Sequence, residues 1–160
     1  MIFVTVGLHY KGFERVIKKM DEIAGKIDEE VIMQIGSSKY KPNNAKFFDF
    51  VEEKKISEYF RQARIIIAHA GAGTILMALS FNKPIIVVPR LKRFGEDIDD
   101  QQLELAEVLS KEGKVIAVYN IELLEEALKN VDKLTFVNVE ERKDKKLVGF
   151  LKEYLRGIEG

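Results

Sequence analysis

A histidine, two glycines and a threonine lie close together after an apolar run, and these residues are the best suited to chemistry. The run Ile65–Ile67 leads through His69 to Gly71, Gly73 and Thr74. An apolar run without polar alternation is typical of a strand buried on both faces, and the residues after Thr74 predict a helix. The first N–H groups of such a helix lack intrahelical partners and lie at the positive end of its dipole. The sequence therefore predicts a phosphate site at this turn.

The residues of this turn have both structural and functional interpretations. Gly71 and Gly73 lack a Cβ, so the backbone there can take positive φ and approach an anion closely. Thr74 can cap the helix or donate its hydroxyl, and His69 would point into the same crevice. Glycine turns of this kind also serve only to pack a helix on a sheet, and histidines are as often structural as catalytic. The rest of the chain has to distinguish these interpretations.

The composition is that of a globular protein of about one domain. The chain has 160 residues, of which 46% are apolar and 32% charged, with no net charge and no cysteine. The balanced charge argues against nucleic acid as a partner, and the lack of cysteine excludes disulfides and thiolate metal sites. We expect a cytoplasmic location, because the amino terminus lacks a signal-peptide pattern and no apolar run spans a bilayer.

Apolar runs alternate with helical patterns along the chain. The predicted strands are Ile2–Val6, Val31–Ile35, Phe47–Val51, a run from Ile65, Ile85–Val88 and Val115–Val118. The predicted helices are Phe13–Ile27, Ile56–Ala63, Thr74–Phe81, a segment from Gln101 that ends at Gly113, Ile121–Leu128 and Leu147–Leu155. This alternation predicts an α/β fold, a single doubly wound domain around a mainly parallel sheet.

In such a fold ligands bind outside the carboxyl ends of the strands. The loops expected there are Gly7–Gly12, Gly36–Ser38, His69–Thr74 and Arg90–Gln102. In the last loop, Arg90, Lys92 and Arg93 are candidates to contact a phosphate or an anionic membrane surface, with plain solubility as the alternative.

Several segments, in matching order and spacing, resemble the carboxyl-terminal, donor-binding half of glycosyltransferase family 28. The matching segments are Phe3–Gly7, Gln34–Ser38, His69–Leu76, Lys83–Pro89 and Gln102–Ala106. The likeness covers about residues 1–130 and is strongest to single-domain members: the catalytic subunit of a two-chain UDP-GlcNAc transferase and exopolysaccharide glycosyltransferase subunits. It implies a Rossmann-like half of a GT-B enzyme, one UDP-sugar-binding domain over residues 1–160, with a carboxyl-terminal helix at about residues 146–156.

The resemblance also implies a role for each matching residue. The donor diphosphate would contact Gly7, His9, Ala70, Gly71, Ala72, Gly73 and Thr74. The uridine would contact Val51, Ile56 and Met77, and the donor sugar would contact Gln101 and Gln102. His69 is the candidate catalytic residue. No metal and no cofactor are expected, because backbone donors and the helix dipole would stabilise the leaving UDP.

Three positions depart from the family pattern. Met77 stands where the family commonly has an acidic residue that binds the ribose hydroxyls, and methionine is a weak acceptor. Gln101 stands where the family commonly has histidine, and Asp97 stands where related subunits often have another. Glutamine can bind a sugar hydroxyl but cannot transfer a proton.

The resemblance implies transfer of GlcNAc or a related hexose from a UDP-sugar to a lipid-linked glycan acceptor. The acceptor site and general base would come from a membrane-anchored partner subunit that recruits the chain to the cytoplasmic face. The apolar face of Leu147–Leu155 is a candidate docking element, or it packs on the sheet. The departures at Met77 and Gln101 favour an alternative, a non-catalytic UDP-sugar-binding module. The chain lacks the glycine turn after the first strand that a nicotinamide or flavin oxidoreductase would have. It also offers no evident partner for His69 in a hydrolase.

Overall fold

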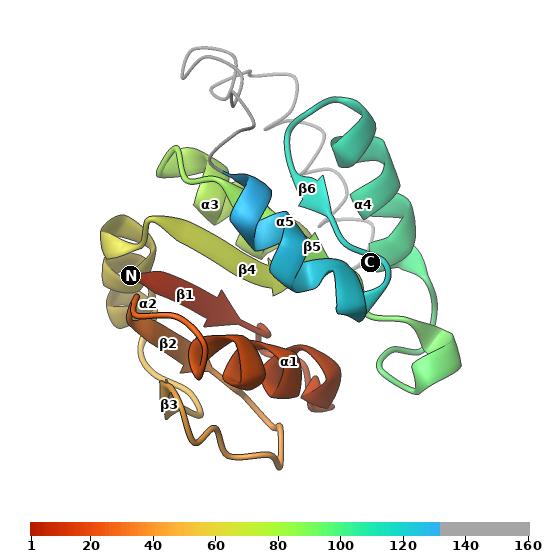
Figure 1. Cartoon of the computed structure of the whole chain (residues 1–160). Helices are drawn as coiled ribbons and strands as arrows, with labels where there is room; N and C mark the ends of the chain where they lie inside the picture. Colours follow the sequence, from red (N-terminus) through yellow and green to blue (C-terminus); the bar gives the residue numbers. More distant parts are fainter. Residues whose placement is uncertain (132–160) are drawn as a thin grey trace.

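The computed structural model describes residues 1–131, which form one six-stranded sheet with helices on both faces (Figure 1). The strands are β1 (Ile2–Thr5), β2 (Val31–Gln34), β3 (Lys46–Phe48), β4 (Ile65–His69), β5 (Ile85–Val88) and β6 (Ile116–Ala117). Their order in space is β3-β2-β1-β4-β5-β6, and every pairing between neighbours is parallel. The predicted doubly wound α/β fold is confirmed.

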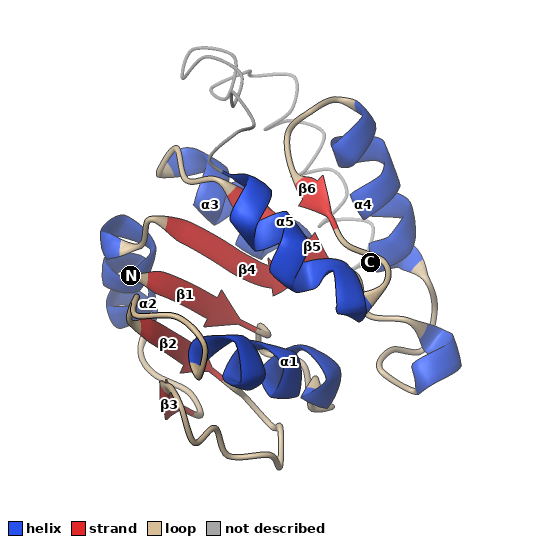
Figure 2. Cartoon of the chain, in the orientation of Figure 1, coloured by secondary structure: helices blue, strands red, loops and turns tan. Residues whose placement is uncertain are grey.

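Within residues 1–131, five α-helices and two short 3₁₀ helices lie between the strands or after the last of them (Figure 2). The α-helices are α1 (Glu14–Ala24), α2 (Glu53–Gln62), α3 (Ala72–Ser80), α4 (Gln101–Lys111) and α5 (Leu124–Asn130). The 3₁₀ helices are η1 (Lys92–Phe94) and η2 (Ile121–Leu123). The predicted helix Leu147–Leu155 lies outside the described residues.

The central strands are apolar up to their last residues, Thr5 in β1 and His69 in β4, because both of their faces are covered. Alternate side chains of a strand point to opposite faces, so each strand contributes to two cores. Ile2 and Val4 pack in one core with α1 and α5. Phe3 packs in the other core with α2, α3 and α4. The unbroken apolar runs that predicted parallel strands therefore match the burial.

The ends of several elements differ from the prediction. The third strand ends at Phe48 rather than Val51, and α2 begins at Glu53 rather than Ile56. Helix α3 begins at Ala72 rather than Thr74. The apolar pattern marks only the buried face of a helix, so it misses a first turn whose side chains are polar or small. As a result, Val51 lies in a loop and Ile56 lies on a helix.

The order of the strands places two loops side by side. The chain runs from β1 outward to β2 and β3, whereas from β4 it runs the other way to β5 and β6. The connections after β1 and β4 therefore separate at the carboxyl ends of these two strands and leave a crevice. The glycine turn after β4 and the loop after β1 both border this point.

Candidate functional site at the carboxyl ends of β1 and β4

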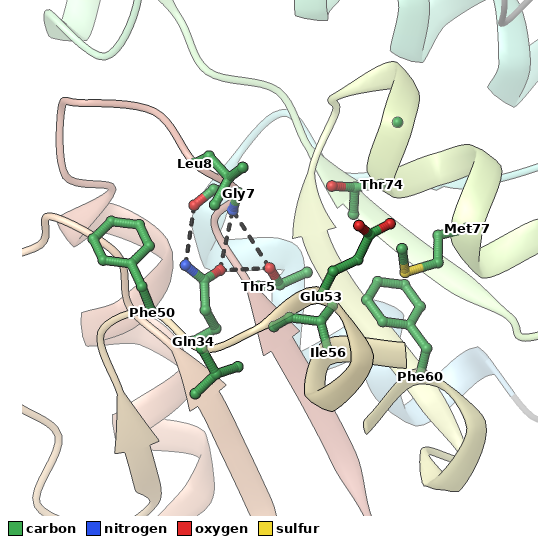
Figure 3. A pocket seen from close by; sticks show the side chains of 12 residues that line it. Thr5, Gly7, Leu8, Gln34, Phe50, Glu53, Ile56, Phe60, Thr74 and Met77 are labelled. Atoms are coloured by element: carbon green, nitrogen blue, oxygen red, sulfur yellow. Dashed lines mark hydrogen bonds between the residues drawn. The ribbon is translucent and has the colours of Figure 1, made fainter. Parts of the chain in front are cut away.

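A cavity of about 270 Å³ lies at the crevice predicted by the strand order (Figure 3). It is lined by Thr5, Gly7, Leu8, Gln34, Phe50, Val51, Glu53, Ile56, Phe60, Gly73, Thr74 and Met77. Most of these side chains are apolar, and a few polar groups lie among them. A concave, largely apolar site with a small number of polar groups is typical of a small-molecule pocket.

The cavity brings together residues from two of the predicted groups. The predicted uridine contacts Val51, Ile56 and Met77 all line it. Of the predicted diphosphate contacts, Gly7, Gly73 and Thr74 line it as well. The other predicted site residues lie outside the lining: His9, His69, Ala70, Gly71, Ala72, Gln101 and Gln102.

The side chain of Gln34 fixes the loop after β1 on the wall of the cavity (Figure 3). Its Oε1 accepts from the Thr5 hydroxyl at 2.6 Å and from the Gly7 N–H at 3.2 Å. Its Nε2 donates to the carbonyl oxygens of Gly7 at 3.0 Å and Asp49 at 3.1 Å. Because Gln34 is buried, one amide holds the ends of β1, β2 and β3 in register at the site.

The two glycines of the turn after β4 have different roles, and neither uses positive φ. Gly71 has φ −85° and ψ 134°, and Gly73 lies inside α3, so the positive φ that glycine allows is not adopted at either. A Cβ at Gly71 would come within 3.0 Å of the His69 imidazole. A Cβ at Gly73 would meet no atom within 4 Å. The absence of a Cβ at Gly71 thus leaves room for the His69 ring, whereas at Gly73 it leaves space in the cavity.

Gly7 is the residue of this site that adopts left-handed backbone, with φ 75°. A Cβ there would also come within 3.0 Å of the His69 imidazole. The ring of His69 therefore lies between two glycines from neighbouring strands. Any side chain at either position would displace it.

Both ring nitrogens of His69 have partners within the protein. Nε2 lies 3.1 Å from Oγ1 of Thr74, and Nδ1 lies 3.2 Å from Nε2 of Gln102. The same Gln102 accepts through Oε1 from the N–H groups of Ala70 at 3.1 Å and Arg90 at 3.0 Å. Burial, with repulsion from Arg90 and His9, lowers the pKa of His69 to about 3. The imidazole is therefore neutral at physiological pH, and Thr74 contacts it instead of capping α3.

Arg90 does not face a ligand, which corrects the expectation that it would contact a phosphate or a membrane surface. Its side chain is fully buried and donates to the carbonyl oxygens of Val6, Gly12 and Glu96 at 3.0 to 3.2 Å. The guanidinium also lies over the ring of Phe13, 4.7 Å from its centroid. The arginine therefore joins the loops after β1 and β5.

His9 and Gln101 lie at the same end of the sheet, outside the cavity. Nδ1 of His9 accepts from the Lys11 N–H at 3.0 Å, and its Nε2 lies 3.5 Å from a carboxylate oxygen of Asp97. Asp97, one of the departures from the family pattern, is therefore a partner of His9. Gln101 is exposed at the start of α4, where its N–H donates to the Asp99 carboxylate.

Glu53 is a functional candidate that sequence reasoning missed. It is the single carboxylate in the cavity lining. Figure 3 shows its side chain extending above Ile56 toward Thr74 and Met77. The segment Val51–Ile56 was the signal that could have found it, but an acidic residue in a charged stretch is usually a solvated helix residue.

The described part of the chain contains neither a metal-binding cluster nor a membrane-spanning helix. Residues 1–131 contain no group of three or more histidines and carboxylates placed to hold a metal ion. Within the same residues, no helix combines the length and apolarity needed to cross a membrane.

Strand order, cavity and helix terminus place the chain in the class of doubly wound α/β domains with a ligand site at the switch point. The family model described as Glycosyltransferase family 28 C-terminal domain matches residues 1–152. The chain therefore belongs to this family.

Relatives and solved structures agree with this assignment. The chain is 33% identical over 93 residues to the UDP-N-acetylglucosamine transferase subunit ALG13 of Candida albicans, covering 58% of the chain and 30% of that protein. Human ALG13 is 31% identical over 123 residues, covering 70% of the chain and 10% of the human protein. The chain thus spans less than a third of either relative. An NMR structure of ALG13 has a TM-score of 0.64 at 18% identity, with 94% of both chains covered.

Proposed function

We propose that the chain is the donor-binding, catalytic subunit of a glycosyltransferase that moves a sugar from a UDP-sugar to a lipid-linked acceptor. One observation carries the proposal: a single cavity contains both the expected uridine contacts and the amino terminus of α3. The names of the relatives point to GlcNAc as the sugar. A related hexose is the alternative that the binding experiment below distinguishes.

The lining suggests how the nucleotide lies. The uracil ring packs against Val51 and Ile56, the apolar residues on the β3–α2 side. The diphosphate lies at the first turn of α3, where Gly73 leaves space and the free N–H groups and helix dipole favour an anion. These backbone donors stabilise the leaving UDP without a metal ion.

Glu53 compensates for the missing acidic residue at position 77. Its carboxylate extends toward Met77 from the opposite wall, where it can accept hydrogen bonds from the two ribose hydroxyls. Glu53 and Met77 then approach the ribose from α2 and α3. The carboxylate that accepts from the ribose hydroxyls lies on α2 instead of α3.

The acceptor site and the general base come from a second, membrane-anchored subunit in this proposal. His69 is a poor candidate for the base, because both of its ring nitrogens are occupied and its pKa is lowered to about 3. In this proposal the base for the acceptor hydroxyl therefore belongs to the partner subunit. The chain would act at the cytoplasmic face of a membrane through this partner.

A non-catalytic UDP-sugar-binding module is the second candidate function. The internal contacts of Gln102 favour it, because an amide that holds Ala70 and Arg90 has little capacity left for a sugar. Such a module would bind the UDP portion of UDP-sugars and would not transfer sugar even with a partner present.

Isothermal calorimetry of the chain against UDP, UDP-GlcNAc, UDP-galactose, UDP-glucuronate and NAD tests the proposal. Each titration is run with EDTA and again with Mg²⁺. We expect metal-independent binding of one UDP-sugar in preference to UDP. Binding of NAD alone would refute the proposal, and equal affinity for UDP and every UDP-sugar would favour the non-catalytic module.

A further inference from the structure

Gln102 has an unambiguous orientation, although the two ends of an amide side chain look alike. Two backbone N–H groups, from Ala70 and Arg90, point at one end of it. An N–H can only donate, so that end must be the oxygen. The NH₂ end of Gln102 therefore faces Nδ1 of His69, at 3.2 Å.

This orientation determines the tautomer of His69. An NH₂ group donates, so Nδ1 must carry a lone pair and accept. In a neutral imidazole the proton is then on Nε2, the nitrogen 3.1 Å from Oγ1 of Thr74. The neutral form is the one present, because burial lowers the pKa of this ring to about 3.

The tautomer in turn sets what the Thr74 hydroxyl can do. Its oxygen accepts from Nε2–H of His69, so its own proton is not used in that bond. Among residues 1–131, the structure gives this proton no acceptor, and Thr74 lines the cavity at the first turn of α3. The hydroxyl proton is then available to a ligand in the cavity.

We propose that Gln102 is a positioning residue which fixes His69 as its Nε2–H tautomer, and that His69 thereby keeps the Thr74 hydroxyl proton free for the donor's phosphate. Gln102 thus acts on the nucleotide through two other side chains, rather than by contacting the sugar. The phosphate part of this inference rests on the proposed function. The tautomer part does not, because it concerns the protein without ligand.

Replacing the amide by a carboxylate reverses the relay. In Gln102→Glu one carboxylate oxygen still accepts from the two backbone N–H groups, and the other accepts from His69. A neutral ring must then carry its proton on Nδ1, so Nε2 accepts the Thr74 proton and the hydroxyl can no longer donate to a phosphate. Gln62→Glu, at the exposed end of α2, is the control for the added charge.

The first measurement is long-range ¹H–¹⁵N NMR of the imidazole nitrogens, which is simple because the chain has two histidines. We expect His69 to have a protonated Nε2 and an unprotonated Nδ1 from about pH 5 to 8. In Gln102→Glu the two signals exchange their character, and in Gln62→Glu they do not. An Nδ1–H tautomer in the natural protein, or no change in Gln102→Glu, would overturn the proposal.

The second measurement is the affinity for UDP in a double-mutant cycle. Thr74→Val and Gln102→Glu should each weaken UDP binding by about tenfold, which corresponds to the loss of one hydrogen bond. The double variant should bind UDP no more weakly than either single variant. Thr74→Ser, which keeps the hydroxyl, should restore the affinity. Additive losses would refute the relay. If the natural chain binds no UDP while the tautomer is as expected, the proposed function fails and the assignment of Gln102 to His69 stands.

Discussion

The two ends of the strands use charged and polar side chains in different ways. At the amino ends, charges pair with each other near the surface: Glu29 contacts the Arg64 guanidinium at 2.8 Å and the Met1 amine at 3.0 Å. At the carboxyl ends, polar side chains bind backbone groups: Gln34 and Arg90 are buried, and Gln102 is half-buried.

This difference explains where a site can form. Ion pairs at the surface compete with water and contribute little to the free energy of unfolding. The charges at the amino ends therefore do little to fix the backbone there. A buried amide or guanidinium fixes the loops that it joins, because leaving their carbonyls without a partner is costly. The carboxyl ends are therefore rigid around the cavity, which is what a binding site requires.

Removing Arg90 should have the largest effect of any change at the carboxyl ends. Arg90→Met keeps an unbranched apolar side chain but removes the guanidinium from the Phe13 ring and leaves three carbonyl groups without their donor. We expect a loss of about 3 kcal/mol in the free energy of unfolding, measured by urea denaturation. Arg93→Met, at an exposed position nearby, should change it by less than about 0.5 kcal/mol. Equal effects would mean that the buried network is not what holds these loops.

Gly73→Asp should separate binding from folding. The new side chain enters open space, so the urea midpoint should stay the same. Its carboxylate would occupy the first turn of α3 and repel a diphosphate, so UDP should bind about a hundredfold more weakly. Gly73→Asn, whose side chain is equal in size and uncharged, should weaken UDP binding clearly less than Gly73→Asp. A normal affinity in Gly73→Asp would remove the helix terminus from the site.

Glu53→Gln should change which nucleotide is preferred. We expect the natural chain to bind UDP about tenfold more tightly than 2′-deoxy-UDP, because the carboxylate accepts from the 2′-hydroxyl. The variant should lose most of that preference in calorimetry. Glu52→Gln, the adjacent exposed residue outside the cavity, should keep it. If the natural chain does not distinguish the two nucleotides, Glu53 does not read the ribose.

Glu29→Gln should show the smallest effect, at the amino ends. Arg64 and the Met1 amine lower the pKa of Glu29 from 4.5 to about 2. The carboxylate therefore adds stability above about pH 4.5, and this contribution disappears as the pH falls toward 2. Urea denaturation at pH 7 should give a difference of at most about 1 kcal/mol, since water screens the pair. The curves of the two proteins should converge near pH 2, whereas a constant difference would point to packing.

The elements of the sheet were predictable because burial on both faces leaves an unbroken apolar run. Ile85–Val88 has the same limits in sequence and structure. The location of the site was predictable for a related reason, since strand ends and a glycine turn are local features. The cavity confirms that the segments containing Gly7, Val51 and Gly73 converge.

Contacts between distant residues were not predictable from one sequence. Gln102 and His69 are 33 positions apart, and only the fold brings the start of α4 to the end of β4. Arg90 was expected to contact solvent or an anion, because arginine is rarely buried. Backbone carbonyls provided its partners, and the sequence does not indicate where such carbonyls are free.

The position of β1 between β2 and β4 also affects how the protein can fold. Ile2 pairs with Val31 on one side and with Ile65 on the other. During synthesis β1 and β2 can pair early, while the opposite edge of β1 stays open until β4 leaves the ribosome. An apolar, unpaired edge is prone to aggregate, and such distant pairing is slow. A fragment that stops after β3 should therefore depend on chaperones, and the nascent chain would need protection until the two central strands meet.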